Sequence, residues 1–265
     1  MSGLSSASIL QVRHLSKSFR GLQALQDINL ELYYGEIQGV IGPNGAGKTT
    51  LFNCLSGAFK PTSGEILLEG QSVGGLPAAR VARLGIARTF QNIRLFGTLS
   101  VLDNVRVAQQ LRTTFNPVEV FVGLPSFWHK ENELVTRSRE LLEIFDLANF
   151  SDQQATNLPY GAQRRLEMAR ALATQPKVLL LDEPAAGMNE TETDELHRTI
   201  MRVRERFGVS IILVEHDMRL IMNLCERITV LSYGKVIARG TPAEIRQNTA
   251  VVESYLGTVS DAATQ

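Results

Sequence analysis

Residues 42–50 match the phosphate-loop pattern G-x-x-x-x-G-K-[ST] and constrain the fold of this chain more than any other stretch. The apolar run 37–41 precedes the match and predicts a buried strand. Residues 50–56 contain no Pro or Gly and predict the first turns of a helix, which ends at Gly57. A glycine-rich turn between a strand and a helix N-terminus gathers backbone N–H groups at one point, so this stretch is suited to binding a polyphosphate.

Within the loop, two side chains have separate expected roles. The Lys48 ammonium is expected to reach the β- and γ-phosphates of a nucleotide, and the Thr49 hydroxyl to ligate Mg²⁺. The nucleotide-binding residues predicted here are Gly42, Pro43, Asn44, Gly45, Ala46, Gly47, Lys48, Thr49 and Thr50.

Composition restricts the class of protein. The chain has 265 residues, 44% of them hydrophobic and 20% charged, with a net charge of zero, so it is not a polycation suited to nucleic acid. Its apolar runs are too short to span a bilayer, and residues 1–8 do not resemble a signal peptide. Cys54 and Cys225 lie in predicted helices without metal-ligand spacing, which favours buried free thiols. A soluble cytoplasmic nucleotide-binding protein is expected.

The order of strand and helix patterns predicts an α/β fold. Residues 9–32 alternate apolar and polar about a turn at Arg20-Gly21, which predicts an antiparallel ribbon. Helical spacing at 101–110 and 131–147 predicts a helical insertion at 92–157. The joining segment 113–130 is rich in Pro and aromatics, and is expected to be a loop or short helix holding either an exposed aromatic cluster or a small local core.

Further helices are expected at 160–174, with Arg164 on a face other than the buried one, and at 242–255 as a tail. Residues 257–265 are expected to be disordered.

Two adjacent carboxylates follow the apolar strand predicted at 177–181. At the carboxyl end of such a strand, Asp182 could hold Mg²⁺ beside Thr49, and Glu183 could orient the water that attacks the γ-phosphate. An isolated Asp-Glu pair would more often be solvated charge, but the phosphate loop upstream favours the metal site.

Three other side chains are candidates from their position. His216 follows the predicted strand 209–214 and could hydrogen-bond the γ-phosphate. Gln91 ends a strand predicted at 86–90 and could reach Mg²⁺ or the attacking water. Phe19 could stack on adenine, although spacing alone favours a core position almost equally.

The segment 158–166, LPYGAQRRL, lies one helix before Asp182 and resembles the L-S-G-G-Q signature of the nucleotide-binding subunits of ABC transporters. Leu158, Gly161 and Gln163 fit that shape, whereas Pro159 replaces the Ser and Tyr160 the first Gly. The family's other motifs follow in order: Phe19 as the A-loop aromatic, 42–50 as Walker A, Gln91 as the Q-loop, 179–183 as Walker B and His216 as the H-loop.

The resemblance covers residues 8–257 and implies an ABC-type P-loop NTPase, with a RecA-like core, an N-terminal antiparallel β-subdomain and an inserted α-helical subdomain. It implies one domain at 8–240, made of core and β-subdomain (8–91 and 158–240) and helical subdomain (92–157), followed by a tail at 241–265. ATP and Mg²⁺ are the implied cofactors. Gly161 and Gln163 are implied to contact nucleotide held by a second ATPase subunit.

Within the family, the chain is most similar to the larger ATPase subunit of branched-chain amino acid importers, on the stretches 87–92, 160–167, 185–189, 214–218 and 254–257. This implies an ATPase at the cytoplasmic face of the inner membrane, with two membrane-spanning permeases and, indirectly, a periplasmic solute-binding protein. Related ATPases for urea or lipopolysaccharide share several of these stretches.

Two residues depart from the family pattern. Pro159 lacks the signature hydroxyl, and Asn189 replaces the usual Asp of the D-loop, so a heterodimer with unequal sites is the hypothesis and a homodimer the alternative. A soluble ABC-type ATPase acting on DNA or ribosomes is a second class, although the chain has one phosphate loop and no heptad array. A P-loop GTPase or small-molecule kinase would leave 158–166 unexplained.

Overall fold

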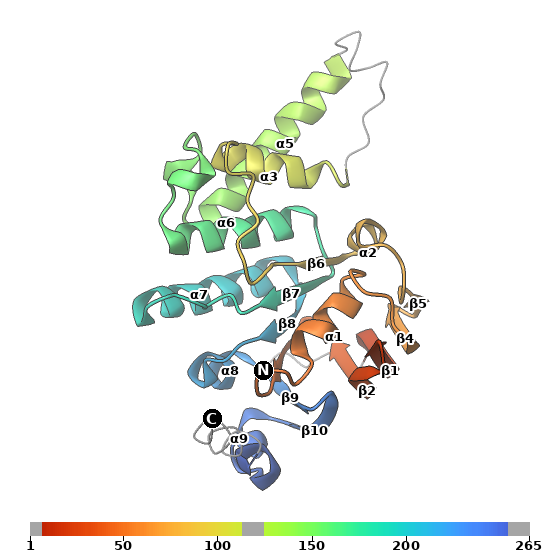
Figure 1. The fold of residues 1–265 in the computed structure, drawn as a ribbon. Coiled ribbons are helices and arrows are strands. Elements are labelled where there is room, and N and C mark those ends of the chain that lie inside the picture. Colours follow the sequence, from red (N-terminus) through yellow and green to blue (C-terminus); the bar gives the residue numbers. More distant parts are fainter. Residues whose placement is uncertain (1–6, 113–124, 254–265) are drawn as a thin grey trace.

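The computed structural model describes residues 7–112 and 125–253 (Figure 1). In chain order, its elements are β1 (Ser8–Phe19), β2 (Leu22–Tyr33), β3 (Ile37–Ile41), α1 (Lys48–Leu55), β4 (Ser63–Leu68), β5 (Gln71–Ser72), α2 (Ala78–Leu84), β6 (Ile86–Arg88), α3 (Val101–Gln109), α5 (Pro125–Ile144), η1 (Ala148–Phe150), η2 (Ala155–Asn157), α6 (Tyr160–Ala173), β7 (Val178–Asp182), α7 (Glu190–Phe207), β8 (Ser210–Val214), α8 (Met218–Leu224), β9 (Arg227–Ser232), β10 (Lys235–Gly240) and α9 (Pro242–Arg246).

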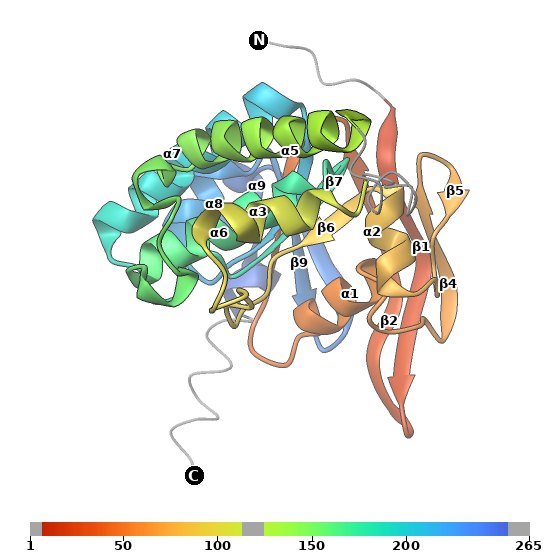
Figure 2. The ribbon, with the colours of Figure 1, turned by 90° about the horizontal axis from the view of Figure 1, so that it is seen from above.

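The N-terminal ribbon forms as predicted, because β1 and β2 pair antiparallel about the turn at Arg20-Gly21. They belong to a four-stranded antiparallel sheet with the order β2-β1-β4-β5. This sheet lies at one side of the molecule in Figures 1 and 2, with α1 between it and the larger sheet.

The larger sheet has six strands in the order β10-β9-β3-β8-β7-β6, and β10 is its antiparallel edge strand. Every residue of β3, β7 and β8 is buried, as near-continuous apolar runs in a parallel sheet predict. Alternate side chains of these strands enter different cores. Leu179 and Leu181 join the core under the helices, whereas Val178 and Leu180 join the core shared with α1 and the antiparallel sheet. The loops at the carboxyl ends of these strands are therefore supported from both faces.

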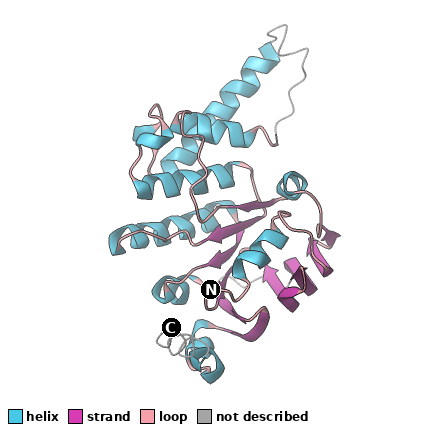
Figure 3. Ribbon diagram, in the orientation of Figure 1, coloured by secondary structure: helices cyan, strands magenta, loops and turns pink. Residues whose placement is uncertain are grey.

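The helices α3, α5 and α6 gather on the side of the sheet away from the antiparallel strands (Figure 3). Helix α5 begins at Pro125, so residues 125–130 of the joining segment are helical and form one helix with most of the segment predicted at 131–147. Proline is tolerated in the first turn of a helix, where its missing N–H has no partner to lose. Trp128 is 60% exposed and Phe127 packs edge-on against it. The other aromatic residues of the segment lie outside the described residues.

Two further boundaries differ from expectation. The tail at 242–255 is not one helix, because α9 ends at Arg246 and a second helical segment covers 249–253. The Asn248 side chain accepts a hydrogen bond from the Val251 N–H and so caps that second segment. Strand β6 ends at Arg88, two residues earlier than predicted. Residues 257–265 lie outside the described residues.

Both cysteines are buried and free, as predicted. Burial raises the pKa of the Cys54 thiol to about 11, and burial likewise raises the pKa of Cys225. Among residues 7–112 and 125–253, no helix is long and apolar enough to cross a membrane.

One buried carboxylate joins the ribbon to the parallel sheet. Glu36 is fully buried between β2 and β3, and it accepts hydrogen bonds from the Tyr33 N–H at 2.7 Å and from Arg227 Nη2 at 2.9 Å. Arg227 is the first residue of β9 and also donates to the Glu31 carbonyl. The contact therefore ties the end of β2 to a strand that neighbours β3.

We expect Glu36→Gln to lower the free energy of unfolding by about 1–3 kcal/mol, because a buried charged hydrogen bond would be lost. Urea denaturation would measure the change. Glu31→Gln is the matched control, since the Glu31 side chain is exposed near the end of β2. An equal loss in both variants would show that the buried contact is not the cause.

Candidate functional site

The phosphate loop lies between the end of β3 and the start of α1, and other backbone segments hold it on two sides. The Gly234 N–H, in the turn between β9 and β10, donates to the Ala46 carbonyl at 3.0 Å. The Gln26 N–H donates to the Gly234 carbonyl at 2.7 Å, so the turn bridges the loop and β2. A Cβ on Gly47, which has φ of 105°, would lie 2.8 Å from the Ala24 carbonyl oxygen. Only glycine fits this close approach of loop and ribbon.

Lys48 begins α1 and folds back over the loop. Its Nζ donates to the carbonyls of Gly42 at 2.6 Å and Pro43 at 3.1 Å, and the residue is 6% exposed. Burial lowers the pKa of Lys48, and the negative charges of Glu183 and Asp182 partly oppose that shift. The buried ammonium is thus held by neutral carbonyls that phosphate oxygens could replace.

The three predicted catalytic side chains, Gln91, Glu183 and His216, meet at a cavity beside the phosphate loop. Glu183 Oε2 accepts from Gln91 Nε2 at 2.7 Å, and Glu183 Oε1 lies 2.9 Å from His216 Nε2. The Glu183 backbone has φ of +49°, and its N–H donates to the Val214 carbonyl at the end of β8. A non-glycine residue with positive φ carries a backbone cost, which often accompanies a functional site.

Asp182 lies deeper than Glu183. It is 3% exposed, and its Oδ2 lies 2.8 Å from Arg88 Nη2. Arg88 also donates to Asn53 Oδ1 at 2.6 Å, so the guanidinium is shared between β6, β7 and α1. Of the predicted metal ligands, Thr49 and Gln91 line the cavity, and Asp182 lies beneath it.

The residues present fit Mg²⁺ better than a metal held entirely by protein. Among the described residues, no group of three or more His, Cys, Asp or Glu could hold a metal ion. Mg²⁺ is commonly bound by one or two protein oxygens together with water and substrate phosphates. The Thr49 hydroxyl and the Asp182 carboxylate match that limited donor set.

The cavity at the loop has a volume of about 540 Å³ and is bounded by the loop, the start of β2, the catalytic side chains and the β9–β10 turn. Its lining residues are Leu22, Gln23, Ala24, Gln26, Asn44, Gly45, Ala46, Gly47, Lys48, Thr49, Thr50, Gln91, Glu183, His216, Tyr233 and Gly234.

Two aromatic side chains, Phe19 and Tyr233, are candidates for contact with a nucleotide base. Phe19 does not line it, but pairs in register with Leu22, which does. The Phe19 ring packs edge-on against Phe59, with Lys17 Nζ 4.7 Å from its centre. Tyr233 lines the cavity and is 81% exposed. The structure therefore supplies a second aromatic candidate that the sequence analysis did not identify.

Gly161 and Gln163 are not brought into the cavity. Gln163 Nε2 donates to the Leu158 carbonyl at 2.9 Å, within the start of its own helix. Gly161 is buried against Glu192, and an added Cβ would lie 2.9 Å from the Glu192 Oε1 atom. These two residues could therefore contact only a nucleotide that is bound by a second chain.

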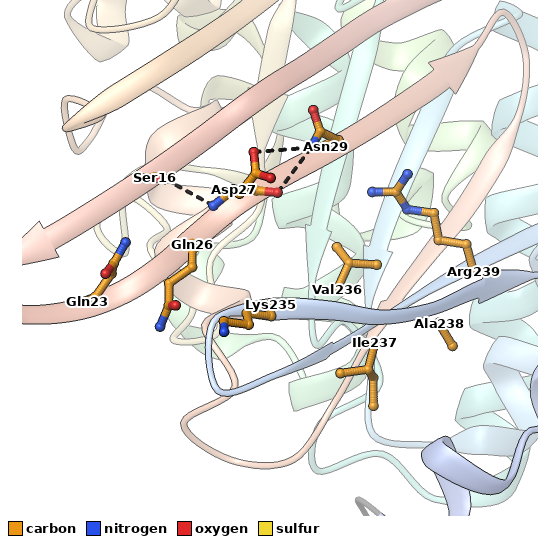
Figure 4. A pocket seen from close by; sticks show the side chains of 10 residues that line it. All are labelled: Ser16, Gln23, Gln26, Asp27, Asn29, Lys235, Val236, Ile237, Ala238 and Arg239. Carbon is orange, nitrogen blue, oxygen red and sulfur yellow. Dashed lines mark hydrogen bonds between the residues drawn. The ribbon is translucent and has the colours of Figure 1, made fainter.

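A larger cavity of about 820 Å³ lies between the ribbon and β10 (Figure 4) and is lined by Ser16, Gln23, Gln26, Asp27, Asn29, Lys235, Val236, Ile237, Ala238 and Arg239. The Asp27 N–H donates to Ser16 Oγ, and Asn29 Nδ2 donates to the Asp27 carbonyl oxygen. These bonds hold the irregular pairing of β1 and β2, and none of the catalytic candidates reaches this cavity. The loop cavity is therefore the better candidate site.

Three residues that were not among the predicted site residues hold segments of the site in place. Arg88 holds Asp182, and Glu215 accepts hydrogen bonds from the N–H groups of Ala185 at 2.7 Å and His216 at 2.9 Å. Burial is the main cause that raises the pKa of the Glu215 carboxyl. Arg164 is only 4% exposed, so the expectation that it lies on a face other than the buried one is wrong. Several of their partners are distant in sequence, such as Asp182 for Arg88 and Ala185 for Glu215, so the neighbouring residues give no signal of these contacts.

Comparison with known proteins identifies two family models along the chain. A model described as "ABC transporter" matches residues 25–186. A second, described as "Branched-chain amino acid ATP-binding cassette transporter", matches residues 235–261. The first covers the phosphate loop, Gln91, the 158–166 segment and both adjacent carboxylates.

Curated relatives extend over nearly the whole chain. The high-affinity branched-chain amino acid transport ATP-binding protein LivG of Escherichia coli K12 is 48% identical over 257 residues, covering 95% of this chain and 99% of LivG. BraF of Pseudomonas aeruginosa, described in the same words, is 43% identical over 95% of this chain and 99% of its own length. The lipopolysaccharide export system ATP-binding protein LptB of Escherichia coli K12 is 35% identical over 94% of this chain and 97% of LptB.

A solved structure supports the same similarity at the level of the fold. The ADP conformation of an ATP-binding cassette from an ABC transporter superposes with a TM-score of 0.82 and 27% identity, covering 95% of this chain and all of that one.

We expect Tyr233→Ala and Phe19→Ala each to weaken ADP binding about tenfold, because base–aromatic stacking contributes about 1–3 kcal/mol. Calorimetric titration with ADP and with pyrophosphate would measure this. Pyrophosphate binding should be unchanged in both variants but lost in Lys48→Ala. Phe207→Ala removes an exposed aromatic at the end of α7 and is the control. An aromatic variant with unchanged ADP affinity would exclude that ring from the base contact.

Proposed function

The chain belongs to the ATP-binding cassette family of ABC transporters, and we propose that it is the ATP-hydrolysing subunit of an importer for branched-chain amino acids. The observation that carries the enzymatic part is the meeting of Gln91, Glu183 and His216 at the cavity that contains Lys48. The choice of solute is supported by the family model matched at 235–261 and by the similarity to LivG and BraF.

The chemistry follows from where each group lies. Loop N–H groups and the end of α1 bind the phosphates, and the Lys48 ammonium exchanges its two carbonyl partners for phosphate oxygens. Glu183 orients and deprotonates the attacking water, while His216 binds near the γ-phosphate. Thr49 and Asp182 would hold Mg²⁺, which would neutralise charge on the phosphates. Gln91 keeps the Glu183 carboxylate aimed at the cavity through its hydrogen bond.

A second ATPase subunit completes the site in this proposal. The loop cavity is open, and Gly161 and Gln163 lie outside it, so an equivalent helix start from another chain would close it. Asn189 accepts from the Glu192 N–H at 2.9 Å as the cap of α7, so its side chain is already engaged within the chain. Together with Pro159 this favours a heterodimer whose two sites are unequal.

A permease is the proposed partner at a groove beside Gln91. The groove has a volume of about 570 Å³ and a mostly apolar wall, which includes Ala82, Phe90, Phe96, Val107 and Leu111. Its walls include α2, the segment after β6, α3 and α6, so a helix seated there would contact the residues next to Gln91. Phe96 is 47% exposed, which suits an unfilled apolar contact. This docking would hold the chain as a peripheral subunit at the cytoplasmic face of the membrane, with a periplasmic solute-binding protein on the far side.

Other solutes are the main alternative. The similarity to LptB keeps lipopolysaccharide open, and urea remains a further option. The matched C-terminal family model favours branched-chain amino acids. A soluble ATPase acting on DNA or ribosomes is less well supported, because the net charge is zero and the wall of the docking groove is mostly apolar.

We expect Glu183→Gln to keep ATP affinity within about twofold and to lower kcat by roughly 100-fold or more, because the amide keeps the shape of the side chain but cannot take a proton. Nucleotide titration and phosphate release would measure the two effects. Glu190→Gln, at an exposed position of α7, is the control. Normal hydrolysis by Glu183→Gln would show that another group activates the water.

The import proposal is tested by co-expression with candidate permeases, followed by purification and assay of ATP-dependent leucine uptake in proteoliposomes. We expect Phe96→Glu to reduce permease co-purification about tenfold, because a charge would be buried in the apolar groove. Phe207→Glu changes a similarly exposed aromatic elsewhere and should leave co-purification unchanged. Co-purification with nucleic acid, or transport of lipopolysaccharide but not leucine, would contradict the proposal.

A further inference from the structure

Arg164, near the start of α6, donates hydrogen bonds to two successive carbonyl groups of a distant segment. Its Nη1 donates to the Phe90 carbonyl at 2.9 Å, and its Nη2 donates to the Gln91 carbonyl at 2.6 Å. Glu167, one turn later in α6, accepts from the Phe90 N–H at 3.2 Å and lies 3.6 Å from Arg164. The segment that ends in Gln91 is therefore held by α6 through both the donor and the acceptor groups of its backbone.

The same guanidinium meets Tyr160, the first residue of α6. The Tyr160 hydroxyl accepts from Arg164 Nε at 3.1 Å and from Nη2 at 2.8 Å. It donates to the Ala186 carbonyl at 3.0 Å, in the loop that follows Asp182 and Glu183. One tyrosine and one arginine thus join three segments, at 90–91, 160–164 and 186, that are separated along the chain.

This network lies directly behind the reacting groups. The backbone carbonyl of Gln91 is bound by Arg164, and the side chain of Gln91 is bound to Glu183. The start of α6 is exposed enough to meet another chain, since Tyr160 is 44% exposed. A change in the position of this helix start would therefore be transmitted to Gln91 through the Arg164 guanidinium.

We propose that Arg164 and Tyr160 are positioning residues that set Gln91, and through it Glu183, according to where the start of α6 lies. The inference rests on the proposed function only for the role of Glu183 in hydrolysis. It assigns to Tyr160, which replaces a signature glycine, a task within its own chain rather than at the nucleotide.

The competing explanation is that Arg164 and Tyr160 only stabilise the fold. Conservative substitutions of the two side chains distinguish this explanation from a positioning role. Arg164→Lys keeps the positive charge, but a single ammonium replaces the planar guanidinium that binds two carbonyls. Tyr160→Phe keeps the ring that packs beside Gly187 and removes only the hydroxyl. Neither change removes a group that touches the phosphate-loop cavity.

The experiment compares Tyr160→Phe and Arg164→Lys, each alone and combined with Gln91→Ala, in the ATPase assembled with its partner subunits. We expect the ATP Kd and KM to stay within about twofold and kcat to fall about tenfold in each variant, the pattern of lost transition-state alignment. On the Gln91→Ala background, the same changes should lower kcat by less than about twofold, because their effect passes through Gln91.

Arg165→Lys is the matched control, since Arg165 is the next residue of α6 and donates instead to the Phe145 carbonyl at 3.1 Å. It should leave kcat unchanged. Thermal unfolding of every variant separates misfolding from misalignment, and Tyr160→Phe is the milder change if Arg164→Lys does not fold.

Additive losses with Gln91→Ala, or an unchanged kcat in Tyr160→Phe, would overturn the inference. Its failure is distinct from failure of the proposed function. If Glu183→Gln is inactive while Tyr160→Phe is as active as the unchanged protein, only the positioning role is wrong. If Glu183→Gln hydrolyses ATP normally, the proposed function itself is wrong.

Discussion

The site depends on backbone contact between the phosphate loop and two segments far from it in sequence. The turn at Gly234 bonds the loop at Ala46 and the ribbon at Gln26, and Gly47 leaves no space for a side chain between loop and ribbon. A phosphate loop must present its N–H groups in a fixed cradle, because reorganisation during the reaction would weaken their stabilisation of charge. The antiparallel sheet therefore contributes to catalysis by supporting the loop rather than by supplying reacting groups.

The parallel strand order explains why the other groups meet there. Strands β6, β7 and β8 are neighbours, and their carboxyl ends deliver Arg88, Asp182 and the Glu215–His216 pair to one edge of the sheet. Both faces of these strands are buried, so their ends cannot shift independently. The buried carboxylates at this edge accept hydrogen bonds, Asp182 from Arg88 and Glu215 from the Ala185 N–H. Gln91 and His216, by contrast, are exposed where they line the cavity.

Much of this arrangement could be predicted because it is written in local patterns. The phosphate loop, the buried strands and the ribbon about Arg20-Gly21 all follow from hydrophobic period, turn residues and motif spacing, and the structure agrees with them within a residue or two. Local patterns failed where long-range contacts decide. Arg164 has the spacing of a surface residue, yet Phe90 and Gln91 bury it. The start of α5 at Pro125 is a different case, because a proline in the first turn is a local signal that apolar spacing alone does not register.

By itself, the sequence determined the class of fold and the phosphate loop, and it predicted Gln91, Glu183 and His216 as catalytic candidates, because these inferences depend on short motifs whose chemistry requires particular side chains. Only the tertiary structure decided that Glu183 accepts from both Gln91 and His216, that Asp182 is held by Arg88, and that Tyr233 joins the cavity wall. Each of these contacts joins strands or loops dozens of positions apart. Their geometry is set by strand order and packing, which no single segment of the chain encodes.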